Sequence, residues 1–221
     1  MTDAPPFVIA NFKANKTLEE LISWLEQVEK NTQNFPGTVA VAPSHPFLAV
    51  LHQKIKSSGW RIKLAAQDIS KFEQGAYTGE FAASQIKNIC TYSIIGHSER
   101  RQNFKEDNEA LSQKVKNAKS VQIEPIFCVQ DENTDIPEGV AIVAYEPVFA
   151  IGTGNPDTPE NAKSVAQNIK SRGQYTVIYG GSVNSQNAKT FLEKDLLDGL
   201  LVGKASLDAG EFIKILESTD Y

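Results

Sequence analysis

Eight short apolar segments, separated by polar or helical stretches, constrain the fold of this chain more than any other feature. Most of them do not alternate polar with apolar residues, which is typical of strands in a parallel sheet that is covered on its outer face. The predicted strands span residues 7–10, 38–42, 61–66, 92–96, 124–129, 140–145, 176–179 and 200–202. Eight parallel strands close a (β/α)8 barrel, and the 221 residues are somewhat fewer than the roughly 250 typical of that fold.

Segments with helical signals follow most of these strands. Thr17 is a predicted helix N-cap, and Thr158-Pro159-Glu160 combines an N-cap with a proline at the first helical position. Further helices are predicted at about residues 45–58, 81–89, 104–118, 159–170, 187–192 and 211–216. An open doubly wound sheet is the alternative, but the first strand–helix junction lacks its Gly-x-Gly-x-x-Gly pattern. We therefore expect one shortened barrel domain over residues 1–221.

The connection between the fifth and sixth strands is unusually short and polar. Residues 130–139 contain almost no apolar side chains, and Pro137 and Gly139 stand near their end. A parallel crossover normally needs a dozen or more residues and usually a helix. We predict that the fifth covering helix is absent or reduced to a turn. The outer faces of strands five and six would then form an exposed apolar contact surface.

Composition and charge narrow the possible partners. The net charge of -5, with both signs mixed along the chain, excludes a nucleic-acid footprint or a basic membrane-binding face. A small anionic substrate stays possible, because local cations and helix N-termini can outweigh a mild global charge. Cys90 and Cys128 lack metal-ligand spacing and are interpreted as buried thiols in a reducing compartment. Because no signal peptide or membrane span is recognised, a cytoplasmic location is expected. No metal site is expected either.

The segment that follows the sixth strand predicts a lid over a carboxylate. Glu146 is expected at the carboxyl end of that strand, directly before a proline that fixes the backbone. An apolar segment that is stiff at one end and jointed by glycines at the other is typical of a lid, although a turn into the next helix is the simpler alternative. The lid residues are Pro147, Val148, Phe149, Ala150, Ile151, Gly152, Thr153 and Gly154.

Polar and charged residues also follow four other strands. In a closed parallel barrel such groups gather at one face, the carboxyl ends of the strands. A base, an imidazole, an ammonium and glycine-bordered amides suit proton abstraction beside the carbonyl of a phosphorylated substrate. Singly, His97 could simply cap a turn and Lys13 could be a solvated charge. The residues are Asn11 and Lys13, His97 and Glu99, Gly180-Gly181-Ser182, and Gly203 with Lys204.

Several of these motifs resemble those of the triosephosphate isomerase family, in order and from the first strand to the last helix. They are Asn11-Phe12-Lys13, Gly75-Ala76-Tyr77-Thr78-Gly79-Glu80, Ile95-Gly96-His97-Ser98-Glu99-Arg100-Arg101, residues 145–154, Tyr179-Gly180-Gly181-Ser182-Val183 and Leu201-Val202-Gly203. The resemblance implies a TIM barrel that interconverts dihydroxyacetone phosphate and glyceraldehyde 3-phosphate without a cofactor, in glycolysis and gluconeogenesis.

The resemblance also implies a role for each catalytic residue. Glu146 would remove a proton from the carbon beside the carbonyl. His97 would be neutral at a helix start and would stabilise the enediolate, the arrangement for which this enzyme family is itself the standard example. Lys13 would supply positive charge, with Asn11 as a further donor and Glu99 in the supporting network.

For the phosphate, the resemblance implies backbone amides of Gly152, Ser182, Gly203 and Lys204, with the closed lid excluding water. The chain departs from the family at four places, and the missing fifth helix is the largest departure. Lys204 replaces a usual second glycine, and Phe149 replaces the usual tryptophan and so lacks an N–H donor. Gln130-Asp131 stand where the family has Gly-Glu.

Assembly is also implied by the resemblance. In the family, the loop that here carries Tyr77 and Thr78 inserts into a neighbouring subunit close to Asn11 and Lys13. We expect an isologous homodimer, and a tetramer if two dimers pair through uncovered outer faces of strands five and six. Two alternatives stay open. One is another phosphate-binding barrel enzyme, such as a lyase of tryptophan biosynthesis, and the other is a catalytically silent interaction module.

Overall fold

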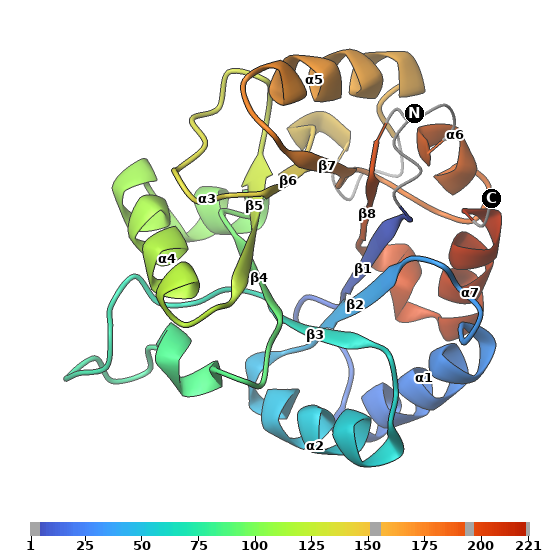
Figure 1. The fold of residues 1–221 in the computed structure, drawn as a ribbon, viewed down its shortest axis with the longest axis horizontal. Coiled ribbons are helices and arrows are strands. Elements are labelled where there is room, and N and C mark those ends of the chain that lie inside the picture. The colour runs from blue at the N-terminus through green and yellow to red at the C-terminus, as the bar shows by residue number, and fades with distance from the viewer. Residues whose placement is uncertain (1–4, 151–155, 193–196, 220–221) are drawn as a thin grey trace.

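The computed structural model describes residues 5–150, 156–192 and 197–219, and in them eight parallel strands form a closed barrel (Figure 1). Each strand pairs with the next, and β8 pairs with β1 from Phe7↔Gly199 to Ala10↔Val202. The predicted (β/α)8 barrel is therefore confirmed. The strands are β1 Phe7–Asn11, β2 Thr38–Ala42, β3 Lys63–Ala66, β4 Tyr92–Ile95, β5 Glu124–Val129, β6 Ile142–Tyr145, β7 Thr176–Tyr179 and β8 Gly199–Val202.

Two apolar layers stabilise the barrel, one inside it and one between strands and helices. Successive side chains of a strand point to opposite faces, so a strand buried on both faces carries no polar alternation. In β5, Ile126 and Cys128 belong to the inner layer, whereas Phe127 and Val129 belong to the outer one. This double burial explains the continuous apolar runs of the sequence.

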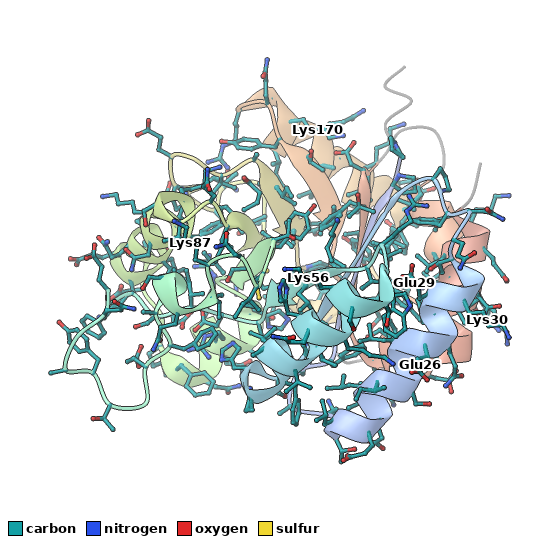
Figure 2. All side chains as sticks on the ribbon, turned by 60° about the horizontal axis from the view of Figure 1, so that its bottom comes forward. Glu26, Glu29, Lys30, Lys56, Lys87 and Lys170 are labelled. Carbon is teal, nitrogen blue, oxygen red and sulfur yellow. The ribbon has the colours of Figure 1, made fainter. Side chains whose placement is uncertain are left out.

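Helices surround the barrel (Figure 1), and exposed charged side chains such as Lys30 of α1 point away from it (Figure 2). Thr17 forms a capping box with Glu20, and the Thr158 side chain accepts the Asn161 N–H, so both predicted N-caps are confirmed. The helices are α1 Leu18–Asn31, α2 Leu48–Ser58, α3 Ser98–Phe104, α4 Asn108–Ser120, α5 Pro159–Ser171, α6 Ala188–Leu192 and α7 Ala209–Ser218, with shorter 3-10 turns η1 His45–Phe47, η2 Ala83–Ile86, η3 Val148–Ala150 and η5 Lys204–Leu207.

Two helix predictions are wrong in their extent. The helix predicted at 81–89 is only the turn η2, because the chain turns away at Asn88, which has a left-handed φ of 66°. The helix predicted at 104–118 is two helices. α3 already starts at Ser98, the chain breaks at Lys105 with a φ of 56°, and α4 begins after its own N-cap, Asp107.

The connection between β5 and β6 contains no helix, as predicted, and runs between α4 and α5 (Figure 1). The exposed apolar surface predicted there is wrong, because Phe127 and Tyr145 on the outer faces are only 1% and 3% exposed. The Arg101 guanidinium lies 5.5 Å from the Phe127 ring centre, and Ile136 of the connection packs on the same layer. Arg172 donates to two backbone carbonyls of the connection. The faces through which two dimers were expected to pair as a tetramer are therefore covered within the subunit.

Within the part of the chain that the structure describes, every helix is too short or too polar to cross a bilayer.

Candidate active site

A cavity of about 720 Å³ opens at the carboxyl ends of the strands. It brings together predicted site residues from β1, β4, β6, β7 and β8 that lie far apart in the sequence. Glu99 does not line it and reaches the site only through Lys13. The predicted residues that line the cavity are Asn11, Lys13, His97, Glu146, Gly180, Gly181, Ser182, Gly203 and Lys204.

Glu146 is the first residue after β6 and is almost completely buried, with 1% of its surface exposed. Its backbone N–H donates to Val129 O at 2.8 Å, which extends the strand pairing to the residue itself. Oε2 accepts the Ser98 N–H at 2.8 Å, and Oε1 lies 3.1 Å from His97 Nε2. Oε1 makes no hydrogen bond of good geometry with the described residues. A buried carboxylate oxygen of this kind is poised to accept a proton from a bound molecule.

Gly180, the residue after β7, makes room for this carboxylate. A Cβ on Gly180 would stand 2.9 Å from Glu146 Cγ and 3.3 Å from Tyr145 O. The first of these distances is shorter than carbon atoms tolerate, so glycine is required by packing here rather than by backbone angles.

His97 is separated from the end of β4 by Gly96 alone and forms the N-cap of α3. Its Nδ1 accepts the Glu99 N–H at 3.2 Å, so the ring proton belongs on Nε2, the nitrogen that faces Glu146 and the cavity. The turn before it is fixed by Arg101, which donates to Gly96 O at 2.8 Å and to Cys128 O at 2.9 Å. The imidazole is therefore a positioned hydrogen-bond donor.

Lys13 brings the ammonium into the site through an unusual backbone conformation, a left-handed φ of 51°. Its N–H donates to Asn11 Oδ1 at 3.1 Å, and its carbonyl accepts from Gln67 Nε2 at 2.8 Å. Such bonds keep a side-chain-bearing residue in a region that usually favours glycine. Lys13 Nζ pairs with Glu99 Oε1 at 2.5 Å, which fixes the direction of the charge.

The far end of the cavity is built from the turns after β7 and β8. Ser182 is half-buried and its carbonyl accepts from Asn187 Nδ2 at 3.0 Å. Gly203 precedes the short turn η5, and Lys204 is exposed at its start. A Cβ on Gly203 would stand 3.8 Å from Lys13 Cε, so this end of the cavity adjoins the ammonium.

The remaining predicted residues lie at the rim or elsewhere. Pro147 is buried, whereas Val148 and Phe149 in η3 are 50% and 63% exposed. Tyr77 and Thr78 lie on an exposed loop that projects away from the barrel (Figure 1). Ala150 is the last residue of η3, and the lid predictions for Ile151, Gly152, Thr153 and Gly154 fall outside the described residues.

Several supporting residues were missed by the sequence analysis. The Ser98 amide, Arg101 and Gln67 all act through backbone groups that are distant in the sequence, up to 54 residues apart for Gln67 and Lys13.

Burial, and then the charge of Glu146, raises the pKa of the Cys128 thiol well above its ordinary value. Across residues 5–150, 156–192 and 197–219, no cluster of three His, Cys, Asp or Glu side chains could hold a metal ion.

Comparison with known proteins agrees with this geometry. The family model described as triosephosphate isomerase matches residues 6–219. The triosephosphate isomerase of Mesomycoplasma hyopneumoniae (strain 7448) is 37% identical over 238 residues, covering 95% of this chain and 97% of the relative. That of Chloroherpeton thalassium is 36% identical over 250 residues, covering 97% and 98%, and that of Aquifex aeolicus 34% over 244 residues, covering 96% and 98%. These alignments are longer than the chain, so the relatives contain residues that it lacks.

Proposed function

The chain belongs to the triosephosphate isomerase family, and from that premise we propose that Glu146, His97 and Lys13 interconvert dihydroxyacetone phosphate and glyceraldehyde 3-phosphate. This interconversion is a step of glycolysis and of gluconeogenesis. The observation that supports these roles is the meeting of a buried carboxylate, an Nε2–H donor and a paired ammonium in one cavity, from three different strand ends.

Glu146 is the proposed base. Its carboxylate removes a proton from the carbon beside the carbonyl and returns it to the neighbouring carbon, so no atom is gained or lost. Glu146 Oε1 and His97 Nε2 lie 3.1 Å apart, and the substrate binds between them and replaces their direct contact. The other oxygen is released from the Ser98 N–H when the carboxylate turns toward the substrate.

His97 and Lys13 stabilise the enediolate that forms between the two proton transfers. The Nε2–H of His97 donates to the substrate oxygen on which negative charge develops. Lys13 places its positive charge next to the same oxygen, and Glu99 holds that ammonium in a fixed direction. Asn11 lines the same wall of the cavity and is a further proposed donor.

The phosphate is proposed to bind at the far end of the cavity, to the amides of Ser182, Gly203 and Lys204. The exposed apolar side chains of Val148 and Phe149, directly after the base, support a lid that packs when substrate is bound. The part of the predicted lid and phosphate site at Gly152 remains a prediction from the sequence.

We also propose that the enzyme is a cytoplasmic homodimer whose subunits are single barrel domains. The loop with Tyr77 and Thr78 supports the dimer, because Tyr77 is 45% exposed and stacks on Phe72 at 4.0 Å. An exposed aromatic side chain on a projecting loop is suited to insertion into a partner.

A coupled assay with glyceraldehyde 3-phosphate tests the proposed function. Glu146→Asp withdraws the carboxylate by about 1 Å, which costs on the order of a hundredfold in rate. The matched control, Glu160→Asp, makes the same change at an exposed position of α5 and retains full activity. An inactive wild type, or a Glu146→Asp variant as fast as the wild type, rejects the assignment.

A further inference from the structure

A buried carboxylate outside the proposed catalytic set lies behind the site. Asp157 precedes the N-cap of α5 and is only 6% exposed. Its Oδ2 accepts from Tyr145 Oη at 3.0 Å and from Asn161 Nδ2 at 2.7 Å. Its Oδ1 accepts the Thr158 N–H at 2.8 Å. Three donors and a helix N-terminus converge on one carboxylate, an arrangement that stabilises a buried negative charge.

The same residue also holds a second tyrosine. The Asp157 N–H donates to Tyr179 Oη at 2.8 Å. Tyr145 and Tyr179 are the last residues of β6 and β7 and are partners in the strand register. Asp157 therefore ties together the ends of the two strands that lead into the site.

Each of these tyrosines lies next to a part of the proposed site. Glu146 follows Tyr145, and the Tyr145 carbonyl accepts the Gly180 N–H at 2.7 Å. A Cβ on Gly181 would stand only 2.2 Å from Tyr179 Oη, so this hydroxyl lies against the glycine turn that leads to the proposed phosphate site. A displacement of either tyrosine moves the base or the turn.

Both hydroxyls remain donors or acceptors in their protonated form at neutral pH. Burial, followed by the charge of Asp157, raises the pKa of Tyr145 above its ordinary value. Burial likewise raises the pKa of Tyr179 to about 12.

We propose that Asp157 is a positioning residue for the isomerase site: through Tyr145 and Tyr179 it fixes the base and the glycine turn relative to each other. It does not line the cavity, so it acts on the reaction only through these partners. The inference rests on the proposed function.

Steady-state kinetics of Asp157→Ala, Asp157→Asn and Tyr145→Phe with glyceraldehyde 3-phosphate test the proposal. We expect Asp157→Ala to lower kcat by about tenfold or more, because a misplacement of about 1 Å can cost a hundredfold. KM changes less, because the substrate contacts remain. Asp157→Asn keeps one acceptor oxygen and falls between Asp157→Ala and the wild type, a partial rescue that a general loss of stability does not give.

A double-mutant cycle and a matched control sharpen the result. Because Asp157 and Tyr145 act as one unit, the double variant Asp157→Asn, Tyr145→Phe is expected to be no slower than about the slower single variant. Glu160→Gln removes an exposed carboxylate from the first turn of the same helix and leaves kcat unchanged.

The outcomes separate this proposal from the proposed function. If the wild type is active, two results overturn the positioning role alone. One is an unchanged kcat in Asp157→Ala. The other is a double variant whose loss in kcat equals the product of the losses in Asp157→Asn and Tyr145→Phe. A wild type without turnover rejects the function first. If circular dichroism shows that Asp157→Ala does not fold, the cycle of Asp157→Asn and Tyr145→Phe decides.

Discussion

At the residue scale, the geometry of the site depends on a glycine without a side chain as well as on the side chains that line the cavity. Gly180 touches Glu146 Cγ so closely that a methyl group has no space. Likewise, Lys13 occupies a left-handed conformation because Asn11 and Gln67 bond its backbone. The geometry of the base and of the ammonium is therefore set by neighbours that do not react.

Gly180→Ala is expected to displace the base and so to lower kcat by roughly 10- to 100-fold, since a shift of about 1 Å can cost a hundredfold. Steady-state assays at saturating glyceraldehyde 3-phosphate measure the effect. The control is Gly210→Ala, where the nearest atom is the carboxylate end of Asp208, and it retains activity. An unimpaired Gly180→Ala variant contradicts the proposed packing of the base.

The position of the proposed reacting residues could be predicted from the sequence, because Glu146, His97 and Lys13 each lie within two residues of the end of an apolar strand. Their supporting partners could not. Arg101 bonds Cys128 O and Asp157 bonds Tyr145, contacts that exist only once β4, β5 and β6 are paired. No local pattern distinguishes Asp157 from an ordinary residue before a helix cap.

At the element scale, a cluster of buried charges holds α4 to the barrel. Lys114, 4% exposed, pairs with Asp68 at 2.7 Å and with Glu106 at 2.6 Å. Arg100 of α3 joins the same two carboxylates. Burial raises the pKa of Asp68 to about 6, and the charge of Lys114 opposes that rise. A raised carboxyl pKa means that, between about pH 4 and 6, the folded protein binds more protons than the unfolded chain, so this group's contribution to stability falls as pH rises.

Lys114→Met is expected to lower the free energy of unfolding by about 3–5 kcal/mol at pH 7.5, because Asp68 and Glu106 then stay buried with only the partly exposed Arg100 as a cation partner. Protonation of Asp68 removes one of the two buried negative charges. The loss in free energy of unfolding relative to the wild type therefore becomes smaller as the pH falls from 6 to 5. Urea unfolding at the two pH values measures it.

The control for this experiment lies on the same helix. Lys119 pairs with Glu124 at 2.8 Å, but its side chain is 42% exposed. Lys119→Met should therefore cost less than about 1 kcal/mol at either pH. Equal deficits in the two variants, or a Lys114→Met deficit that grows toward pH 5, contradict the account of the cluster.

Some elements were predictable and others were not, for reasons that their residues show. The bounds of β5 and β7 matched, because both strands are apolar and end at polar or glycine residues. The break between α3 and α4 was missed because Lys105 gives no local sign of a left-handed φ. The absent fifth helix was predictable from length and polarity. The burial beneath it was not, since it depends on Arg101 and Ile136 filling the space.

At the scale of the whole molecule, closure of the barrel gathers the ends of β1, β4, β6, β7 and β8 around one cavity. The loop with Tyr77 and Thr78 lies outside this closed unit (Figure 1). The proposed dimer therefore adds contacts to a subunit whose reacting groups all come from one chain.

Thr78→Arg is expected to shift the protein from a dimer to a monomer and to lower activity, because a bulky charge at this exposed position of the loop opposes insertion into a partner. Light scattering coupled to size exclusion measures the mass. The matched control, Ser164→Arg, places the same side chain at an exposed position on α5 and stays dimeric. A fully active wild-type monomer contradicts the dimer.

The central claim is that a carboxylate in this cavity moves a proton between two neighbouring carbons of a triose phosphate. Proton NMR of wild-type turnover in D2O tests it without coupling enzymes. The account predicts conversion of glyceraldehyde 3-phosphate to dihydroxyacetone phosphate, with solvent deuterium on C1 of part of the product. Absence of conversion, or a product that never carries deuterium, would contradict it.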